Sequence, residues 1–415
     1  MKESRNPKGT RDYLGAEQAL RRRIQKTLEE VFECYGVQTA ETPIICYYDV
    51  LASKYAGGAE ILKEVYRLND QGQRELALRY DLTVPFCRMV EMNPDIRLPY
   101  RRYEIGRVFR DGPIKTGRLR EFMHCDVDVE GSSSLVVEAE LMTMAAEAFA
   151  RLEMDVYIAY NNRKLLNGIM AGLEIPSQIW EAFILVLDKL DKVAEEAVRQ
   201  ELMGLKISAL QLDKLFALRQ SNAMLDELEN DFSNPYFSKG ASEIRELQEY
   251  LELLGVTDKV LFQPFLARGL SIYTGTVYEV FICDQSFYSS LAAGGRYDQI
   301  IGAFINNGRE YPAAGISFGL DAIFQVLQQN SRAAEARPLD FYIILLGTLN
   351  ESLKLAQELR QNGLRAEVDI SGRRLKKALD YANREGLKQV LILGENELAS
   401  GKISLKLCRM AGKRM

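Results

Sequence analysis

The sequence predicts an α+β protein with an antiparallel sheet, a helical insertion and a small C-terminal α/β domain. Three observations lead to this fold class. Apolar and polar residues alternate at strand spacing in much of the chain before residue 165, a helical pattern fills residues 165–255, and strands alternate with helices after residue 338. Because the 415 residues exceed the size at which one hydrophobic core stops growing, about 250–300 residues, we expect two or three domains.

Composition excludes several classes of protein. Hydrophobic residues make up 47% of the chain, but no stretch approaches the ~20 consecutive apolar residues that span a bilayer, so we expect no membrane protein. The N-terminus lacks the apolar run of a secretory signal, which predicts a cytoplasmic protein. The six cysteines form no CxxC pair and the chain has one histidine, which predicts buried free thiols and no metal site.

Charge is divided unevenly along the chain, whose net charge is −5. Residues 338–415 contain 14 Lys and Arg against 9 Asp and Glu, a balance of +5 that leaves −10 for residues 1–337. A basic C-terminal part suits contact with a polyanion such as nucleic acid, and a solvated basic surface is the simpler alternative.

The first elements are a helix and a hairpin. Helical spacing is shown by the apolar residues Leu20, Ile24, Leu28, Val31, Phe32 and Tyr35, and Gly36 follows at the position of a C-terminal cap. Pro43 has no amide donor and therefore marks the start or edge of a strand. Residues 64–80 alternate around a turn at 69–72, which predicts a β-hairpin. Asp81 and Thr83 then open a helix.

Residues 103–110 and 122–130 alternate in polarity and predict two neighbouring antiparallel strands. On the second strand, one face carries Phe122, His124, Asp126, Asp128 and Glu130, and the other carries Met123, Cys125, Val127 and Val129. A solvated sheet face would explain this polarity as simply as a binding site would. Three arginines lie in or beside the connection, namely Arg110, Arg118 and Arg120. They suit phosphate binding, because a guanidinium pairs with phosphate oxygens at two points and stays charged.

The remaining segments divide the chain into domains. The predicted domains are residues 1–164 together with 256–330, a helical insertion at 165–255 with runs at 179–202 and 244–254, a linker at 331–337, and an α/β domain at 338–415. Strands at 277–282 and 290–293 and a helix at 320–327 complete the main domain. In the last domain, strands at 341–346, 366–370 and 390–393 alternate with helices at 353–359 and 375–383, which predicts a largely parallel sheet.

The two-stranded segment belongs to a longer set of motifs. Its sequence, RYEIGRVFR at 102–110, GRLREF at 117–122 and CDVD at 125–128, resembles motif 2 of the histidyl-tRNA synthetases, a family of class II aminoacyl-tRNA synthetases. Further signatures of that family are resembled by RYDLTVP at 79–85, RGLSIYTG at 268–275, AGGRYD at 293–298, Pro43 at the place of motif 1 and residues 315–322 at the place of motif 3. This resemblance implies the class II synthetase fold, with an antiparallel sheet of six or more strands.

The resemblance also implies an activity: a histidine–tRNA ligase that uses ATP and Mg²⁺ to form histidyl-adenylate, transfers histidine to tRNA(His), and works as a homodimer. ATP binding is implied for Arg110, Arg118, Glu121 and Arg268, of which Arg110 and Arg268 are implied to be catalytic. Amino-acid binding is implied for Asp81, Thr83, His124, Asp128, Tyr273 and Arg268. Asp81 would pair with the α-ammonium, and Asp128 and Tyr273 with the imidazole.

A basic helix start in the C-terminal domain suits RNA phosphates. Its residues are Arg373, Arg374, Lys376 and Lys377. A solvated helix end is the alternative interpretation.

Four positions depart from the family's pattern. His124 replaces a glutamine, Ser271 an aspartate, Ile272 a tyrosine, and Ala322 the arginine that contacts the γ-phosphate. A lost charge-assisted contact weakens binding by ~1.5–3 kcal/mol unless another cation replaces it. The same comparison of patterns leads us to expect a C-terminal domain that is shortened at its end. Two alternatives to the ligase therefore stay open: a non-catalytic paralogue, such as a regulatory subunit of ATP phosphoribosyltransferase, and a paralogue that activates another amino acid.

Overall fold

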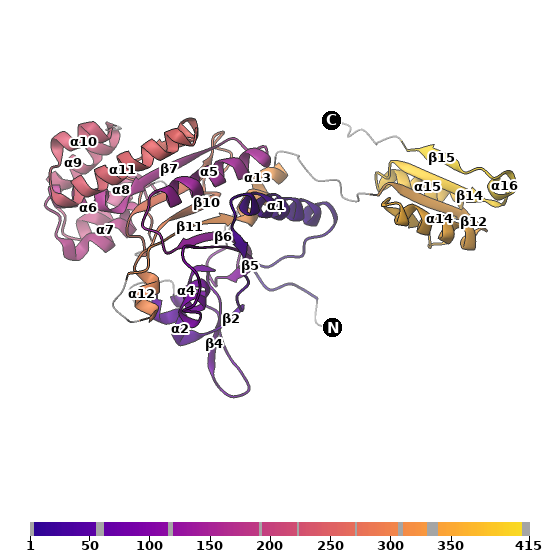
Figure 1. Ribbon diagram of the computed structural model, residues 1–415, viewed down its shortest axis with the longest axis horizontal. Helices are drawn as coiled ribbons and strands as arrows, with labels where there is room; N and C mark the ends of the chain where they lie inside the picture. The colour runs from indigo at the N-terminus through magenta and orange to yellow at the C-terminus, as the bar shows by residue number, and fades with distance from the viewer. Residues whose placement is uncertain are drawn as a thin grey trace. The chain divides into compact units, whose positions relative to one another are not determined.

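The computed structural model describes residues 4–54, 62–114, 119–190, 193–221, 224–269, 272–305, 310–329 and 339–408 (Figure 1). The chain divides into two compact units, the first formed by residues 1–12 and 21–332 and the second by residues 13–20 and 333–415. The predicted linker at 331–337 lies outside the described residues. No helix in the described part of the chain has the length and apolar character needed to cross a membrane.

An eight-stranded sheet forms the centre of the first unit. Its strands lie in the order β1 (Gln38–Thr39), β5 (Tyr100–Phe109), β6 (Glu121–Glu130), β11 (Ala313–Gly319), β10 (Ala292–Arg296), β9 (Thr276–Ile282), β7 (Val156–Asn162) and β8 (Val260–Phe262). The six central strands pair antiparallel, and β1 and β8 join the two edges in parallel. The predicted antiparallel sheet of six or more strands is confirmed, and the two short edge strands make the whole sheet mixed.

A second, three-stranded sheet contains the predicted hairpin. Its strands are β2 (Ile45–Tyr47), β4 (Glu75–Leu78) and β3 (Arg67–Asn69), all antiparallel, and α2 (Tyr48–Lys54) follows β2. In the turn, Asp70 Oδ1 accepts a hydrogen bond from the amide of Arg74 at 3.0 Å. After the hairpin comes α4 (Thr83–Met92), and Asp81 accepts from the amide of Val84 at 3.0 Å, which satisfies a free donor of its first turn.

Helices cover the apolar face of the large sheet. The helices α1 (Gly15–Cys34) and α5 (Val136–Arg151) pack on this face. A further helix, α13 (Leu320–Gln329), follows β11. The ring of Phe318 lies 5.4 Å from that of Phe32 on α1 and 5.8 Å from that of Phe149 on α5. The opposite face meets α4 and α12 (Ile300–Ile305), whose buried core includes Phe86 and Ile301. Both faces of the sheet are therefore covered over part of their area.

Between β7 and β8 the chain is helical. The helices are α6 (Arg163–Gly172), η1 (Ser177–Ile179), α7 (Trp180–Leu187), α8 (Glu195–Gly204), α9 (Ala209–Gln220), α10 (Leu225–Asp231), α11 (Pro235–Leu253) and η2 (Thr257–Lys259). Figure 1 shows them gathered beside β7. The predicted helical run at 179–202 is divided, because α7 ends at Leu187 and α8 begins at Glu195. A Cβ on Gly168 would lie 2.3 Å from the amide nitrogen of Phe237, so glycine lets α6 and α11 cross closely.

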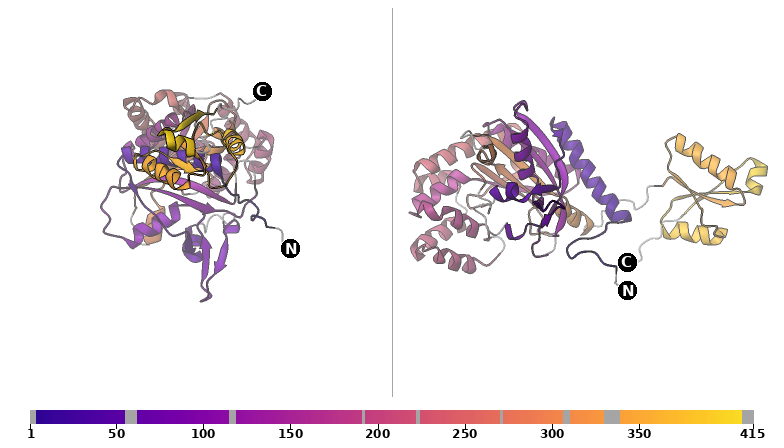
Figure 2. Two further views of the ribbon diagram at one scale, coloured as in Figure 1. Left: turned by 90° about the vertical axis from the view of Figure 1, so that its right-hand side faces the viewer. Right: turned by 90° about the horizontal axis from the view of Figure 1, so that it is seen from below.

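The second unit contains a four-stranded sheet (Figure 2). Its strands lie in the order β13 (Ala366–Val368), β12 (Phe341–Leu346), β14 (Gln389–Gly394) and β15 (Ser404–Leu407); the first three are parallel and β15 is antiparallel. Its helices are α14 (Leu349–Gln361), α15 (Leu375–Arg384) and α16 (Glu395–Ser400). Ile343 packs with Ala356 of α14, and its neighbour Tyr342 packs with Ala378 of α15. The two long helices therefore cover opposite faces, as expected of an α/β domain.

The cysteines do not all belong to the core. All six are free thiols, and only Cys87 and Cys125 are buried. The expectation of buried thiols is wrong for Cys34 and Cys283, which are exposed.

Candidate active site

The strand β6 carries the polar row predicted from the sequence. Its pairing places Asp126 between Glu104 of β5 and Ser317 of β11, and places Asp128 between Arg102 and Gly315. Asp126 is 3% exposed and Asp128 is 4% exposed. The solvated-face explanation is therefore wrong, because partner side chains and the α4 side of the unit bury these carboxylates.

Asp128 is held by two groups. The Nη2 atom of Arg102 lies 2.6 Å from its Oδ2, and the hydroxyl of Tyr297 donates a short hydrogen bond to its Oδ1. Arg102 in turn lies 4.5 Å from the centre of the Phe86 ring on α4 and donates to the carbonyl of Leu82 at 3.1 Å. A buried carboxylate is tolerated only when it is paired in this way.

A second ion pair lies beside the first. Glu104 accepts from Arg79 Nη1 at 2.6 Å and from the hydroxyl of Thr42 at 2.9 Å. Arg79 also donates to the carbonyls of Thr42 and Arg107 at 2.9 and 2.8 Å. Arg79 therefore ties the segment before α4 to β5 and positions Asp81, two residues later.

Burial changes the acidity of the central carboxylates. Burial, reinforced by the charges of Asp128 and Asp81, raises the pKa of Asp126 to about 8. Burial also raises the pKa of Asp128, and Arg102 and the Tyr297 hydrogen bond oppose that rise. Asp126 thus takes up a proton near neutral pH, and Asp128 keeps more of its charge because it has a cation beside it.

His124 lies on β6 two residues before Asp126, and its strand partners are Gly106 and Gly319. Its Nδ1 is 3.1 Å from the hydroxyl of Ser317, and its ring meets that of Phe122 edge to face. Burial, followed by the charges of Arg110 and Arg79, lowers the pKa of His124 to about 3. Its imidazole is therefore neutral in the physiological range.

Two glycines in register bring Asp128 and Tyr273 together. A Cβ on Gly315 would lie 2.1 Å from Asp128 Oδ1, and a Cβ on Gly295 would lie 2.8 Å from the Tyr273 ring. Gly295 and Gly315 are direct partners on β10 and β11. The Asp128 carboxylate and the Tyr273 ring therefore extend over adjacent positions of the same sheet face.

Arg268 is anchored to that sheet face by β9. It forms a short ion pair with Glu279 of β9, and its guanidinium carbon is 5.9 Å from the centre of the Tyr273 ring. Its buried Nε has no hydrogen-bond partner among the described residues. Glu279 pairs with Ala293, which pairs with Ser317, which pairs with Asp126. Three strand spacings of ~4.8 Å put Glu279 roughly 14 Å from Asp126, with small side chains between them.

Arg110 lies between two aromatic rings. Its guanidinium carbon is 4.3 Å from the centre of the Tyr80 ring and 5.0 Å from that of Phe122, and its Nε donates to the carbonyl of Tyr80 at 3.2 Å. Glu121 instead accepts from Arg107 at 2.7 Å, in a pair whose arginine is mostly exposed. Aromatic stacking fixes the plane of the Arg110 guanidinium group.

Two known protein families match this chain in sequence. A family model described as histidyl-tRNA synthetase matches residues 9–323. The chain belongs to the histidyl-tRNA synthetase family. A second model, described as an anticodon binding domain, matches residues 340–411. Members of this family use ATP and bind histidine and tRNA.

Individual relatives extend the match over the whole chain. A protein named histidine–tRNA ligase 1, from Bacillus cereus, is 49% identical over 409 residues, which are 98% of this chain and 96% of the relative. A protein named histidine–tRNA ligase 2, from Shouchella clausii, is 46% identical over 404 residues, 97% of this chain and 95% of the relative. The crystal structure of histidyl-tRNA synthetase from Nostoc sp. PCC 7120 has a TM-score of 0.84 at 30% identity and covers 98% of this chain and 95% of that one.

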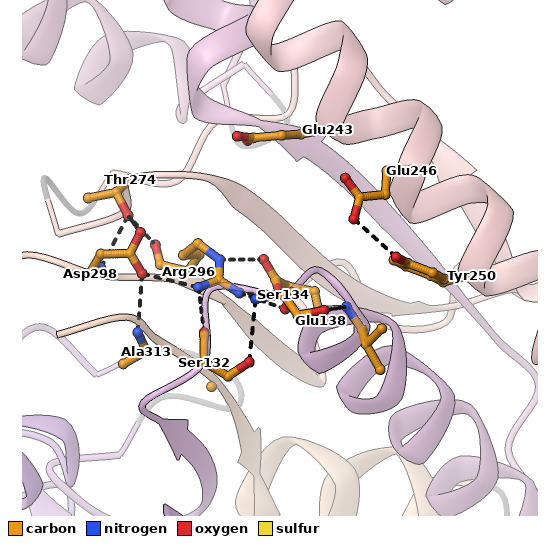
Figure 3. A network of polar contacts seen from close by, with 12 residues as sticks. Ser132, Ser134, Glu138, Glu243, Glu246, Tyr250, Thr274, Arg296, Asp298 and Ala313 are labelled. Atoms are coloured by element: carbon orange, nitrogen blue, oxygen red, sulfur yellow. Dashed lines mark hydrogen bonds and ion pairs between the residues drawn. The ribbon is translucent and has the colours of Figure 1, made fainter. Parts of the chain in front are cut away.

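The synthetase signature at 293–298 contains a fully engaged arginine. Figure 3 shows Arg296 at the centre of a polar network, where its Nε and Nη2 donate to the two oxygens of Glu138 at 2.7 and 2.6 Å. Nη1 donates to the carbonyl of Ser132 and to Asp298, and Nη2 donates to the carbonyl of Ser134. All five guanidinium donors have a partner. Arg296 therefore supports the synthetase site and has no donor left for a substrate.

The same network fixes the segment that carries Tyr273. Asp298 accepts from the hydroxyl of Thr274 at 3.1 Å and from the amide of Ala313 at 3.1 Å. The amide of Thr274 donates to the carbonyl of Arg296 at 2.9 Å. Thr274 is the next residue after Tyr273, so these bonds limit the positions that the tyrosine ring can take.

The departures from the synthetase pattern have different surroundings. Ile272 packs against two buried clusters, those of Phe86 and of Leu266, and so forms apolar wall where the family has a hydroxyl. Ala322 follows Asp321, which forms a short ion pair with Arg21 and accepts from the amide of Met123 at 2.8 Å. Arg118 and Ser271 lie outside the described residues.

The basic residues of the C-terminal domain begin α15. Arg374 is the residue before the first turn of α15 and makes no side-chain capping bond; the side chains of Arg373, Arg374, Lys376 and Lys377 are exposed. Arg373 lies 4.2 Å from the centre of the Tyr381 ring and 3.6 Å from Asp369. Arg374, Lys376 and Lys377 are therefore presented to solvent beside a partly anchored Arg373.

Sequence reasoning missed several supporting residues of this site. Those not predicted are Arg79, Arg102, Glu104, Glu279, Tyr297 and Ser317. Arg102 and Glu104 could have been found, because strand alternation gives them the same spacing as Asp126 and Asp128 once the two strands are paired.

Proposed function

We propose that the chain is a histidine–tRNA ligase. It activates histidine with ATP, forms histidyl-adenylate and pyrophosphate, and transfers the histidyl group to tRNA(His). The observation that carries this proposal is the convergence of Asp128 and Tyr273 over two paired glycines, with arginines on both sides. The names of the full-length relatives favour the ligase over a regulatory subunit or a paralogue with another substrate.

The amino acid is recognised by paired polar groups. Asp128 and Tyr273 bind the two imidazole nitrogens of the substrate, one of which donates while the other accepts. Asp81, at the start of α4, and the neighbouring Thr83 bind the α-ammonium. Such a pocket excludes a different side chain, because each buried polar group left unpaired costs ~1–3 kcal/mol.

The reacting phosphate of ATP lies between Arg110 and Arg268. An oxygen of the histidine carboxylate attacks the α-phosphorus of ATP, the bond to the β-phosphate breaks, and pyrophosphate leaves. Arg110 binds the α-phosphate, Arg268 stabilises the charge that develops on the transferring phosphate, and Arg118 and Glu121 contact the rest of ATP. Fixed guanidinium groups stabilise this charge without reorganisation. A terminal hydroxyl of the tRNA then attacks the carbonyl carbon, and AMP leaves.

Mg²⁺ enters this proposal as a companion of ATP. Within the described ranges, no group of three or more acidic, cysteine or histidine side chains is arranged to hold a metal. Mg²⁺ commonly binds substrate phosphates and water rather than a complete protein cage. The ion would therefore reach the site on the phosphates.

The wider organisation is also part of the proposal. Residues 1–164 and 256–330 form the catalytic domain, 165–255 the insertion and 338–415 the anticodon-binding domain, with Arg373, Arg374, Lys376 and Lys377 on RNA phosphates. Two copies form a homodimer in the cytoplasm. The family model for an anticodon binding domain and the exposed basic start of α15 support the RNA contact.

Amino-acid-dependent exchange of labelled pyrophosphate into ATP tests the activation step. We expect exchange with histidine and none above background with the other standard amino acids. Exchange with another amino acid in place of histidine would support the altered paralogue. No exchange by a folded chain that still binds histidine would support the regulatory subunit. Arg268→Ala is the matched inactive control, because it removes the guanidinium proposed for the transferring phosphate.

A further inference from the structure

Among the described residues, the polar contacts of the His124 ring lie at Nδ1, and its aromatic contact is with Phe122. Nδ1 is 3.1 Å from Ser317 Oγ and 3.6 Å from Asp126 Oδ1, and the ring centre is 5.2 Å from that of Phe122. None of these contacts involves Nε2. The side chain is 16% exposed, so part of the ring remains open to a ligand.

The hydroxyl of Ser317 decides which ring nitrogen carries the proton. Ser317 donates a short hydrogen bond to Oδ1 of Asp126. A serine hydroxyl has one proton, so the same oxygen can only accept from His124. Because Oδ1 accepts from Ser317, the proton that Asp126 takes up near neutral pH lies on Oδ2. The contact with Ser317 therefore places the His124 proton on Nδ1.

A proton on Nδ1 leaves a lone pair on Nε2, because the imidazole is neutral. Burial, then the charges of Arg110 and Arg79, disfavours the protonated ring and lowers the pKa of His124 to about 3. One carboxyl group, that of Asp126, lies 3.6 Å from Nδ1, on the side of the ring away from Nε2. A neutral ring nitrogen with a lone pair accepts a hydrogen bond from an N–H donor, and a cationic donor makes the stronger bond.

We propose that Ser317 and Asp126 are positioning residues that hold His124 in the Nδ1–H tautomer, so that Nε2 accepts a hydrogen bond from the α-ammonium of the amino-acid substrate. The proposal rests on the proposed function for the identity of the ligand. Recognition of the α-ammonium at this position then depends on His124 and Asp126 of β6 and on Ser317 of β11. Ser317 acts through His124 and does not touch the substrate.

The tautomer can be observed directly, because His124 is the only histidine in the chain. The full chain, labelled with ¹⁵N in its histidine ring and prepared without a histidine tag, is measured by two-bond proton–nitrogen NMR at pH 7 without ligands. We expect a protonated Nδ1 and an unprotonated Nε2. Ser317→Ala should shift the population toward the Nε2–H form, and Ser317→Thr should keep the wild-type pattern. A wild-type spectrum with the proton on Nε2, or with both nitrogens protonated, would overturn the proposal.

Kinetics then separates positioning from general damage to the pocket. In pyrophosphate exchange, Ser317→Ala should raise KM for histidine about 10-fold, with kcat changed less than about 3-fold, while Ser317→Thr stays close to wild type. In a His124→Gln background, where no tautomer exists, Ser317→Ala should change KM less than about 2-fold. Equal effects in both backgrounds would contradict the proposal. The NMR result does not need activity, so a chain with no exchange at all would refute the proposed function and leave the tautomer assignment to be decided by its spectrum.

Discussion

Arg296 and Glu138 form a buried ion pair with two parallel hydrogen bonds. Arg296 Nε and Nη2 lie 2.7 and 2.6 Å from the two carboxylate oxygens, and the side chains are 5% and 0% exposed. The pair joins α5 to the strand β10, whose neighbouring glycine lies under Tyr273. Removing Glu138 takes away both of these bonds and leaves the buried Arg296 with Asp298, at 3.2 Å, as its remaining acidic partner.

Glu138→Ala is therefore expected to lower the free energy of unfolding by about 3–5 kcal/mol. Urea denaturation followed by circular dichroism measures this change. Glu140→Ala is the matched control on the same helix, because Glu140 pairs with Arg101 at 2.7 Å but both side chains are 31% exposed. That control should lose less than about 1 kcal/mol. Equal losses in the two variants would show that the Arg296 pair does not stabilise the site as described.

Asp128→Asn is expected to raise KM for histidine about 100-fold, because the amide removes an anionic acceptor and leaves Arg102 with Glu104 as its remaining acidic partner. Pyrophosphate exchange at varied histidine concentration measures it. Tyr297→Phe keeps the carboxylate and removes one hydrogen bond, so it should raise KM only about 5-fold. A wild-type KM in Asp128→Asn would remove Asp128 from the histidine pocket.

His124 makes stability depend on pH in a defined direction. Burial holds the pKa of His124 at about 3 in the folded chain, against about 6.5 in an unfolded chain. Between pH 6.5 and about 3 the unfolded chain takes up a proton on His124 that the folded chain does not. The free energy of unfolding therefore falls as the pH falls through this range. Between pH 6.5 and 4.5, wild type should lose about 2 kcal/mol more stability than His124→Gln. Parallel pH profiles for the two proteins would mean that His124 titrates normally.

The basic start of α15 is expected to act on RNA and not on activation. Replacing Arg374, Lys376 and Lys377 with glutamine should weaken tRNA binding at least about 10-fold and reduce the salt slope of log K by about 2, since each phosphate contact contributes ~0.7–0.9. Filter binding at several salt concentrations measures both. Pyrophosphate exchange should remain at the wild-type level. The matched control is Arg365→Gln, on an arginine already paired with Asp340. The same salt slope in the triple variant as in wild type would exclude these residues from the RNA contact.

Much of the fold follows from local patterns. The strand at 341–346 was predicted with the bounds that β12 has, because a parallel strand buried on both faces is a continuous apolar run. The edge strands β1 and β8 were not predicted, since two or three residues carry no period. Residues 179–202 were predicted as one helical run, because their apolar pattern continues across the break between α7 and α8.

The candidate site was predictable in part. Alternation on β6 identified the residues that share a face, but it did not show that α4, from an earlier segment, lies on the Arg102 side and that the carboxylates are buried. Tyr297 and Ser317 come from segments more than 160 residues away in sequence. Their contacts depend on strand order across the sheet, which a local pattern does not specify.

Charging of tRNA tests the central claim most directly. Purified chain is incubated with ATP, Mg²⁺, labelled histidine and a tRNA(His) transcript, and acid-precipitable label is counted. We predict histidyl-tRNA that requires ATP and falls at least about 100-fold in Arg268→Ala, because that variant lacks the cation for the transferring phosphate. No charging by the folded wild-type chain, with the transcript shown to be chargeable by another histidyl-tRNA synthetase, would contradict the assignment of this site to a histidine–tRNA ligase.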